Sequence, residues 1–328
     1  MNPFFSIGVV TYNRREMLKD CLSSILRQTF SDFEIIVGND FPKDKLSAEF
    51  LGIHDPRIQF VNNVRNLGEI KNGNAVLKMS RGKYFTWLDD DDMYAPSFLH
   101  EAYAFLSKLD SPDCVFTSYM TGDIFPEKME FPKSEVKLFS GREFLRQYLL
   151  RKIKTQGCYG LFKAEYLKGI GGMEQLGNGS FSPYSDNLLV IRAGLLKRIV
   201  YIDSPLVFFR THAGSGTWTN ADVDAYRSAQ ADFLSKSVEI FKELYDDFYS
   251  NLFLLLEWCV SDYSTVMIRS GFLQIKKLIK YNLFIMRYAL MLKQYCCRMI
   301  WILHRSMFYL IRIMVKTKFC HIFRSANH

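Results

Sequence analysis

The sequence predicts an α/β fold in which a mainly parallel sheet is flanked by helices, followed by an α-helical region towards the C-terminal end. Three observations lead to this prediction. Short apolar runs alternate with segments of helical periodicity over about the first 120 residues, and polar clusters stand at the ends of three of these runs. Beyond about Ala221 the pattern is helical nearly to the end of the chain.

The predicted strands are short runs rich in β-branched and aromatic residues. In chain order they are Phe4–Val10, Phe33–Val37, Arg57–Val61, Tyr84–Leu88 and Cys114–Tyr119. Apolar residues at helical spacing predict helices over Arg14–Gln28, Gly68–Ser80 and Pro96–Leu109. Because helices connect the strands, we expect most of the strands to run parallel in one sheet.

The stretch from residue 121 to residue 220 has a less regular pattern. It predicts an extended or hairpin segment over Lys128–Ser140, helices over Arg142–Lys152 and Ser185–Leu196, and a strand over Ile199–Phe209 that Ser204-Pro205 interrupts. The following loop, Ala213–Asn220, contains glycines, small polar residues and one large aromatic residue, Trp218. This composition is typical of a mobile loop that an aromatic side chain anchors.

Polar clusters follow three predicted strands at their carboxyl ends. They are Thr11-Tyr12-Asn13, Asn39-Asp40 and Asp89–Asp92. In open α/β sheets, ligands bind beyond the carboxyl ends of the strands. If these strands are neighbours, their loops converge on one crevice, which makes the three clusters a candidate binding site.

The run of four aspartates, Asp89–Asp92, requires a positive partner. Adjacent carboxylates repel one another by about 1 kcal/mol per close pair even in water. An Asp-x-Asp pair at a strand end suits Mg²⁺ or Mn²⁺, because these ions take carboxylate oxygens and share substrate phosphates. The alternative is a solvated acidic turn, or a helix N-cap, because Asp91 and Asp92 precede a predicted helix.

The composition excludes several protein classes. The chain of 328 residues is 48% hydrophobic and 15% aromatic, which is enough for a sizeable core and argues against global disorder. Its seven cysteines show no CxxC pair or metal-ligand spacing, so we expect buried free thiols in a reducing compartment. The segment MNPFFSIGVVTYNRR lacks the pattern of a cleavable signal peptide, which predicts a cytoplasmic protein.

The positive charge of the chain is concentrated in its tail. After Asp262 there is no acidic residue, and the tail contains 12 of the 42 basic residues, so 30 basic and 34 acidic residues remain in residues 1–262. At about 100° per residue, eight of the basic side chains fall within about 20° of one helical line. These are Arg269, Lys276, Lys280, Arg287, Arg298, Arg305, Arg312 and Lys316.

This basic stripe runs beside a broad apolar, aromatic-rich surface that includes Trp301. The combination predicts helices that lie in the interface of an anionic membrane surface via residues 269–324. A spanning helix is not expected, because no stretch near 20 residues lacks Lys or Arg. The alternative is a helical bundle with its basic faces in solvent. No nucleic-acid motif accompanies the charge, so no nucleic-acid partner is expected.

Six blocks of the sequence, in order, resemble family 2 glycosyltransferases of the GT-A fold, whose sheet is Rossmann-like and mainly parallel. The blocks are Ser6–Arg14 (SIGVVTYNR), Glu34–Asp40 (EIIVGND), Asn66–Asp92 (NLGEIKNGNAVLKMSRGKYFTWLDDDD), Gly160–Met173 (GLFKAEYLKGIGGM), Tyr184–Gly194 (YSDNLLVIRAG) and Leu206–Thr217 (LVFFRTHAGSGT). The resemblance covers roughly residues 4–218. It implies a catalytic domain over 1–220, with a nucleotide-sugar-binding half over about 1–120 and an acceptor-binding half over about 121–220. Residues 221–328 remain as the basic amphipathic helical region.

The resemblance also implies roles for individual residues. Asp186 takes the place of the catalytic base, which accepts a proton from the acceptor hydroxyl. Asp91, Asp89 and His212 are implied as metal-binding residues for Mn²⁺ or Mg²⁺ at a DXD motif. The implied donor-binding residues are Thr11, Tyr12, Asn13, Asp40, Asn74, Asp89, Asp90 and Arg210. The implied acceptor or lid residues are Ser185, Arg192 and Trp218.

The sequence departs from the family pattern at several of these positions. Asn39 replaces a common aspartate, and Phe41-Pro42 replaces the usual Gly-Ser, which puts the nucleotide contacts of that loop in doubt. Lys71 and Asn72 stand where small residues are frequent, so the donor preference does not carry over. Ser185 replaces a common glutamate, which removes one carboxylate that often helps to position the acceptor.

The expected function is that of an inverting glycosyltransferase with a nucleoside-diphosphate-sugar donor, first among them a UDP-sugar. The resemblance implies that the acceptor is a growing glycan, such as a lipid-linked polysaccharide or O-antigen unit, and that the enzyme is peripheral to the inner face of the cell membrane. Two alternatives remain: a sugar nucleotidyltransferase, and a non-catalytic glycan- or membrane-binding subunit of a polysaccharide assembly complex. Association into a homo-oligomer also stays open.

Overall fold

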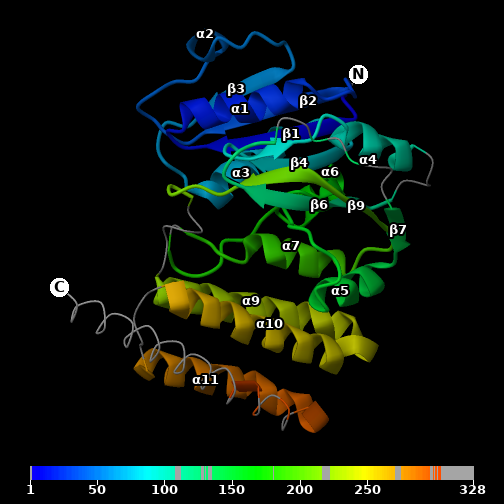
Figure 1. Ribbon diagram of the computed structural model, residues 1–328, viewed down its shortest axis with the longest axis vertical. Coiled ribbons are helices and arrows are strands. Elements are labelled where there is room, and N and C mark those ends of the chain that lie inside the picture. Colours follow the sequence, from blue (N-terminus) through cyan, green and yellow to red (C-terminus); the bar gives the residue numbers. More distant parts are fainter. Residues whose placement is uncertain are drawn as a thin grey trace, which may run out of the picture. The chain divides into compact units, whose positions relative to one another are not determined.

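The structure is a computed structural model, and it describes residues 2–107, 112–126, 129, 131, 135–179, 181–215, 222–269, 275–295, 298, 300 and 302–303. The chain forms two compact units (Figure 1). The first consists of Met1–Gln175 and Ser180–Ser215, and the second of Leu176–Gly179 and Gly216–His328.

The first unit is built on a nine-stranded sheet with helices packed on it. Its strands are β1 Phe5–Thr11, β2 Phe33–Asn39, β3 Ile58–Asn62, β4 Tyr84–Asp89, β5 Met93–Tyr94, β6 Cys114–Gly122, β7 Glu135–Phe139, β8 Leu161–Lys163 and β9 Ile199–Arg210. Its helices are α1 Arg15–Leu26, α2 Ala48–Leu51, α3 Glu69–Met79, α4 Phe98–Leu106, α5 Gly141–Leu149, α6 Ala164–Gly169 and α7 Ser185–Ala193.

One half of the sheet is parallel, as the alternation of strands and helices predicts. The order of the strands is β3-β2-β1-β4-β8-β6-β9-β5, and the pairs β3–β2, β2–β1, β1–β4 and β6–β9 are parallel. Every residue of β1 and β2 is buried, which is typical of parallel strands covered on both faces. Helix α3 packs closely over this half: a Cβ on Gly38 would lie 2.5 Å from Asn72 Oδ1 and 2.7 Å from a methyl group of Val76.

The other half of the sheet contains antiparallel strands, of which only β7 lies in a segment, Lys128–Ser140, that the sequence predicts to be extended or a hairpin. Strand β8 pairs antiparallel with β4 and β6, and β5 and β7 pair antiparallel with β9. The prediction that Ser204-Pro205 interrupts the last strand is wrong, because β9 continues through it. Its register against β6 shifts on both sides of Ser118, which pairs with Pro205. A proline is tolerated where the ladder is irregular.

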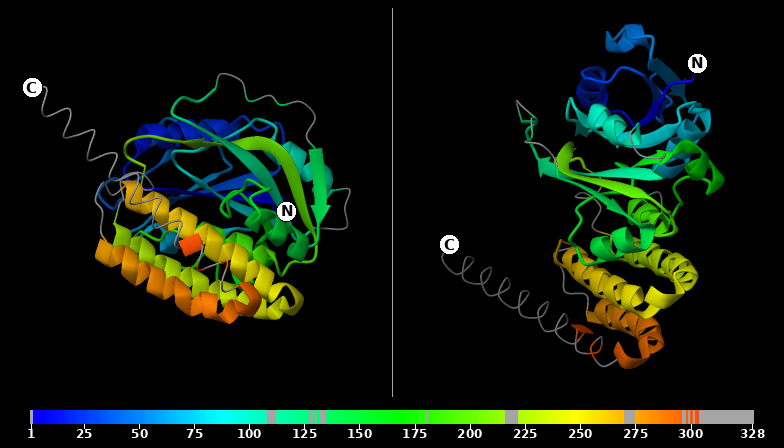
Figure 2. Two further views of the ribbon diagram at one scale, coloured as in Figure 1. Left: turned by 60° about the horizontal axis from the view of Figure 1, so that its bottom comes forward. Right: turned by 90° about the vertical axis from the view of Figure 1, so that its right-hand side faces the viewer.

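The second unit is helical, as the pattern beyond Ala221 predicts. Its described elements are α9 Val223–Glu243, η1 Tyr245–Asp247, α10 Phe248–Arg269, α11 Ile275–Ala289 and η2 Leu290–Tyr295. Helix α10 packs against both α9 and α11 (Figure 2). Asp222 caps α9 by accepting hydrogen bonds from two backbone amides.

A buried polar contact joins α9 to α11 inside this unit. The Tyr281 hydroxyl donates to Oε1 of the buried Gln230 at 2.7 Å, and the Tyr281 ring stacks on Tyr263 of α10 with 3.7 Å between centroids. Among the described residues, no helix has both the length and the apolar character needed to span a membrane. Of the predicted basic stripe, Arg305, Arg312 and Lys316 lie outside the described residues.

Candidate active site

A tight turn at the end of β4 gathers the four aspartates. The backbone amide of Asp92 donates to the carbonyl of Asp89 at 3.0 Å, and the chain then enters β5. Because β4 pairs with β1 and β5 pairs with β9, the sheet fixes the turn on both sides. Val10 pairs with Asp89 and Thr11 pairs with Asn39, so the three predicted polar clusters meet at one edge of the sheet.

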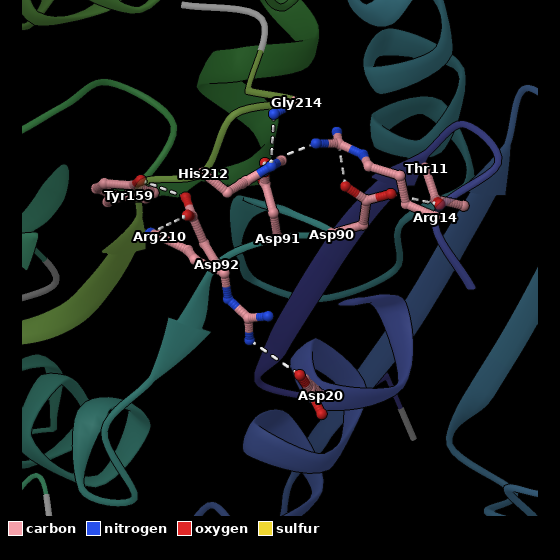
Figure 3. A network of polar contacts seen from close by, with 10 residues as sticks. All are labelled: Thr11, Arg14, Asp20, Asp90, Asp91, Asp92, Tyr159, Arg210, His212 and Gly214. Carbon is pink, nitrogen blue, oxygen red and sulfur yellow. Dashed lines mark hydrogen bonds and ion pairs between the residues drawn. The ribbon is translucent and has the colours of Figure 1, made fainter. Parts of the chain in front are cut away.

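The aspartates are held by groups from distant parts of the first unit (Figure 3). Thr11 Oγ1 donates to Asp90 Oδ2 at 2.5 Å, and Arg14 Nη1 donates to Asp91 Oδ2 at 2.6 Å. Arg14 Nη2 also lies 2.8 Å from Asp90 Oδ1, although that oxygen accepts no aligned hydrogen bond from the described residues. Both oxygens of Asp92 are bonded: Oδ2 accepts from the Tyr159 hydroxyl at 2.5 Å, and Oδ1 from the backbone amide of Arg210 at 2.9 Å.

His212 approaches the same carboxylate as Arg14. Its Nε2 lies 2.9 Å from Asp91 Oδ2, and its Nδ1 accepts a hydrogen bond from the backbone amide of Gly214 at 3.1 Å. Because Nδ1 acts as the acceptor, a neutral His212 carries its proton on Nε2 and donates it to Asp91. The guanidinium of Arg210 points elsewhere and donates to Asp20 at 3.0 Å.

The crowding of these carboxylates changes their acidity. Burial, and then repulsion from Glu69 and Asp92, raises the pKa of Asp89 well above its ordinary value. Burial and the charge of Asp91 raise the pKa of Asp92 in the same direction. Burial raises the pKa of Asp90 to about 7, although the positive charge of Arg14 opposes the shift. The site therefore contains more negative charge than its own neighbours stabilise.

These residues fit a hard divalent cation. One carboxylate oxygen from each of Asp89, Asp91 and Asp92 lies within 4.8 Å of the others, which is a donor set of the kind that Mg²⁺ and Mn²⁺ prefer. The sequence indicated Asp89, Asp91 and His212 for this role. The structure adds Asp92 to the cluster and places His212 on an oxygen of Asp91.

Asp186 is in the first turn of α7, in the same region of the first unit. Its Oδ1 accepts a hydrogen bond from the backbone amide of Cys158 at 3.0 Å. The Cys158 carbonyl in turn accepts from the Trp87 amide and the Thr86 hydroxyl of β4, so Asp186 is tied to the strand that ends at Asp89. Burial raises the pKa of Asp186, although the hydrogen bonds from Cys158 oppose the shift. The negative charge of Asp186 is also one of the smaller causes of the raised pKa of Asp89.

Glu69, the first residue of α3, is a further acidic group that the sequence did not single out. Desolvation of its carboxylate, and then repulsion from Asp186, raises the pKa of Glu69 to about 7, while the residue as a whole stays exposed to solvent. Glu69 thus brings a second, accessible carboxylate close to Asp186.

Other residues expected at the site have structural partners instead. Both oxygens of Asp40 accept hydrogen bonds: Asn63 and the amides of Leu67 and Gly68 supply the donors at 2.7–3.0 Å. These four bonds occupy the acceptor positions of one carboxylate and fix the start of α3. The Asn74 amide makes two bonds to the backbone of Met173, at 2.8 and 2.9 Å.

The structure also gives the contacts of the residues that the resemblance implied for the acceptor and for the loop after β1. The Ser185 hydroxyl bonds to the Glu174 carbonyl at 2.7 Å, and Arg192 forms an ion pair with the carboxylate of Glu174. Tyr12 is exposed, with its ring edge-on to Phe41, and Asn13 takes a left-handed backbone conformation with φ of 54°. Trp218 lies outside the described residues.

Arg14, Tyr159 and Glu69 are site residues that the sequence did not single out, and it indicated Asp92 only as part of the acidic run. The positions of two of them in the sequence could have indicated a role in the site, because Arg14 directly follows the Thr11-Tyr12-Asn13 cluster and Asp92 ends the acidic run. The positions of Tyr159 and Glu69 could not, because only the folded chain brings them to the aspartates.

Known proteins resemble the chain both in sequence and in fold. Residues 6–168 match the profile described as "Glycosyl transferase family 2". The chain is 31% identical over 166 residues to an uncharacterized glycosyltransferase of Methanocaldococcus jannaschii; the match covers 47% of this chain and 57% of that protein, so the chain spans little more than half of its length.

Two solved structures share the fold. S. aureus TarS in complex with UDP-GlcNAc aligns over 81% of both chains, with a TM-score of 0.54 and 17% identity. Mannosyltransferase PcManGT from Pyrobaculum calidifontis, in complex with GDP-Man and Mn²⁺, aligns over 95% of this chain and 88% of that one, with a TM-score of 0.52 and 15% identity. Likeness at this level of identity establishes a common GT-A architecture.

Proposed function

This chain belongs to glycosyltransferase family 2 through residues 6–168, and we propose that it is an inverting glycosyltransferase that uses a nucleoside-diphosphate sugar as its donor. The observation that carries the proposal is the position of Asp186. Its carboxylate accepts the Cys158 amide, and the Cys158 carbonyl accepts hydrogen bonds from Thr86 and Trp87 of β4, the strand that ends at Asp89. These bonds support a site that contains both a base candidate and a cation-binding cluster. Sugar transfer from a nucleotide donor needs both.

In this proposal, Asp186 accepts the proton of the acceptor hydroxyl as the oxygen attacks the anomeric carbon. The amide of Cys158 orients the Asp186 carboxylate for that step. Asp89, Asp91 and Asp92 would hold Mg²⁺ or Mn²⁺, which when bound neutralises charge on the diphosphate leaving group. A single displacement of this kind inverts the anomeric configuration.

A UDP-sugar is the first donor to test and a GDP-sugar the second. TarS, which shares the fold, is solved with UDP-GlcNAc, and PcManGT with GDP-Man and Mn²⁺. Thr11, Tyr12 and Asn13 stand at the edge of the sheet where a nucleotide would lie, and exposed Tyr12 offers an aromatic face for a base. Asp40 contributes indirectly in this account, by fixing the start of α3.

We further propose that the acceptor is a growing glycan on a lipid carrier and that the chain works at an anionic membrane surface. The support comes from α11, where Ile279 and Leu283 are 49% and 64% exposed and stand next to the exposed basic residues Lys280 and Arg287. Apolar and basic groups on one exposed face are typical of interfacial helices.

The proposed function is tested by donor binding. Purified wild-type chain and Asp91→Asn are mixed with Mn²⁺ and a panel of nucleoside-diphosphate sugars, and thermal stability is followed. We expect at least one donor to raise the melting temperature of the wild type, because a ligand that binds only the folded state stabilises it. Asp91→Asn should lose most of that shift. Stabilisation of neither protein by any donor would refute the proposal.

A further inference from the structure

Arg14 occupies the position where the aspartate cluster needs a positive charge. Its guanidinium is 2.6 Å from Asp91 Oδ2 and 2.8 Å from Asp90 Oδ1, and its side chain is 34% exposed. Arg14 is the N-cap residue of α1, yet its side chain makes no cap hydrogen bond. The left-handed conformation of Asn13, at φ of 54°, stands directly before it in the β1–α1 turn.

Arg14 and a divalent cation would compete for the negative charge of Asp91. Asp91 is one of the three carboxylates that fit a cation, and its Oδ2 already carries the shortest contact of Arg14. A cation on the same carboxylate would stand within a few ångströms of the guanidinium, where two positive charges repel strongly in a site partly shielded from water. The exposed side of Arg14 gives the long side chain a route out of the site.

We propose that Arg14 is the internal counter-ion of the cluster, and that a divalent cation must displace its guanidinium from Asp91 in order to bind. This inference rests on the proposed function. In the absence of the cation, Arg14 holds the Asp90 and Asp91 carboxylates in place through its two short contacts. Once displaced, it remains tethered to the β1–α1 turn at the edge of the site. Arg14 is a positioning residue that sets how tightly the site binds Mn²⁺ or Mg²⁺.

The test compares Mn²⁺ binding by the full chain with and without this competitor. Arg14→Gln removes the charge, and Arg15→Gln makes the same charge change one residue later. Arg15 bonds to the Phe50 carbonyl and stacks 4.3 Å from the Phe50 ring, so it has no contact with the aspartates in the described structure. Dissociation constants are measured without nucleotide by electron paramagnetic resonance or calorimetry, with every protein at the same pH and ionic strength.

We expect Arg14→Gln to bind Mn²⁺ about tenfold more tightly than the wild type, because a charge-assisted hydrogen bond no longer has to be broken. Arg15→Gln should match the wild type. Arg14→Lys, which keeps a charge but lacks the planar guanidinium that contacts both carboxylates, should lie between the wild type and Arg14→Gln. The melting temperature of Arg14→Gln should be lower than that of the wild type without Mn²⁺ and equal to it at saturating Mn²⁺.

Two results would overturn the inference while leaving the proposed function intact. In the first, Arg14→Gln binds Mn²⁺ no more tightly than the wild type, although a nucleoside-diphosphate sugar still raises its melting temperature. The other is equal tightening by Arg14→Gln and Arg15→Gln, which would show a general charge effect. If the wild type and all three variants bind no Mn²⁺, the inference and the metal-binding part of the proposed function fail together. If Arg14→Gln does not fold, the same comparison with the wild type and Arg15→Gln is made with Arg14→Lys.

Discussion

The backbone at Gly157 determines where Asp186 stands. A Cβ atom added to Gly157 would lie 2.2 Å from the carbonyl oxygen of Asp186 and 2.8 Å from Leu189 Cβ, so only glycine allows this approach of the loop to α7. The next residue, Cys158, donates its amide to the Asp186 carboxylate. Two consecutive residues therefore position and orient the proposed base.

Gly157→Ala should displace Asp186 and slow sugar transfer by about 10- to 100-fold, because small misplacements of a reacting group are costly. The overlap should also lower the free energy of unfolding by about 1–3 kcal/mol. The matched control is Gly169→Ala at the end of α6, where an added Cβ meets nothing within 4 Å. Transfer rates and urea unfolding check both effects. A Gly157→Ala enzyme that is as fast as the control would show that Asp186 does not depend on this contact.

The sequence indicates the acidic residues at the end of β4, but it does not indicate the groups that bind the acidic residues of the site. Asp89 and Asp91 lie in the cluster where the acidic run predicts them, because strand ends in a parallel sheet meet at one edge. Asp40 also lies at that edge, but its carboxylate is used by the amides of Leu67 and Gly68, 27 and 28 residues further along the chain. Backbone donors at such a distance leave no signal in a residue pattern.

Among the elements, the two-residue strand β5 has the largest effect on the site. Met93 and Tyr94 pair with Phe208 and Val207 of β9, and this pairing fixes the aspartate turn. A strand of two residues is too short for an alternation pattern to show, so the sequence does not predict it. The helices α1 and α3, by contrast, begin and end within a few residues of their predicted limits, since each is long enough to show helical periodicity.

Helix α11 carries the membrane proposal. Tyr281 and Ile285 face the interior of the second unit, whereas Ile279, Leu283 and the basic residues Lys280 and Arg287 are exposed. The exposed face combines apolar and positive groups, and each basic residue near an anionic membrane contributes about 1 kcal/mol to binding.

The full-length variant Lys280→Gln/Arg287→Gln should therefore bind vesicles that contain phosphatidylglycerol about 10- to 30-fold more weakly than the wild type. The control Lys43→Gln/Lys45→Gln removes the same charge from the exposed loop after β2 and should bind as the wild type does. Vesicle flotation measures the affinities. If the wild type binds pure phosphatidylcholine vesicles as tightly as vesicles that contain phosphatidylglycerol, an electrostatic contribution from α11 is contradicted.

For the molecule as a whole, the sequence predicts the class of fold and the parallel direction of its first strands. The parallel pairing of β1, β2, β3 and β4 follows from strands that alternate with helices, whereas their order, β3-β2-β1-β4, comes from the structure. The antiparallel strands β5, β7 and β8 do not follow, because their pairing depends on contacts between distant segments and not on a local pattern. The GT-A resemblance rests on blocks spread over both halves, and the solved structures bear it out at the level of the fold.

Sugar transfer with Asp186 as the base is tested most directly by the pH profile of turnover for the wild type and Asp186→Asn, with the donor that stabilises the wild type. Asp186 must be deprotonated to accept a proton, and burial raises its pKa, so the wild-type rate should rise with pH through a value above the usual aspartate range. Asp186→Asn should still bind the donor, turn over at least about 100-fold more slowly and lack this rise. Turnover by Asp186→Asn at the wild-type rate, with the same rise, would contradict the account.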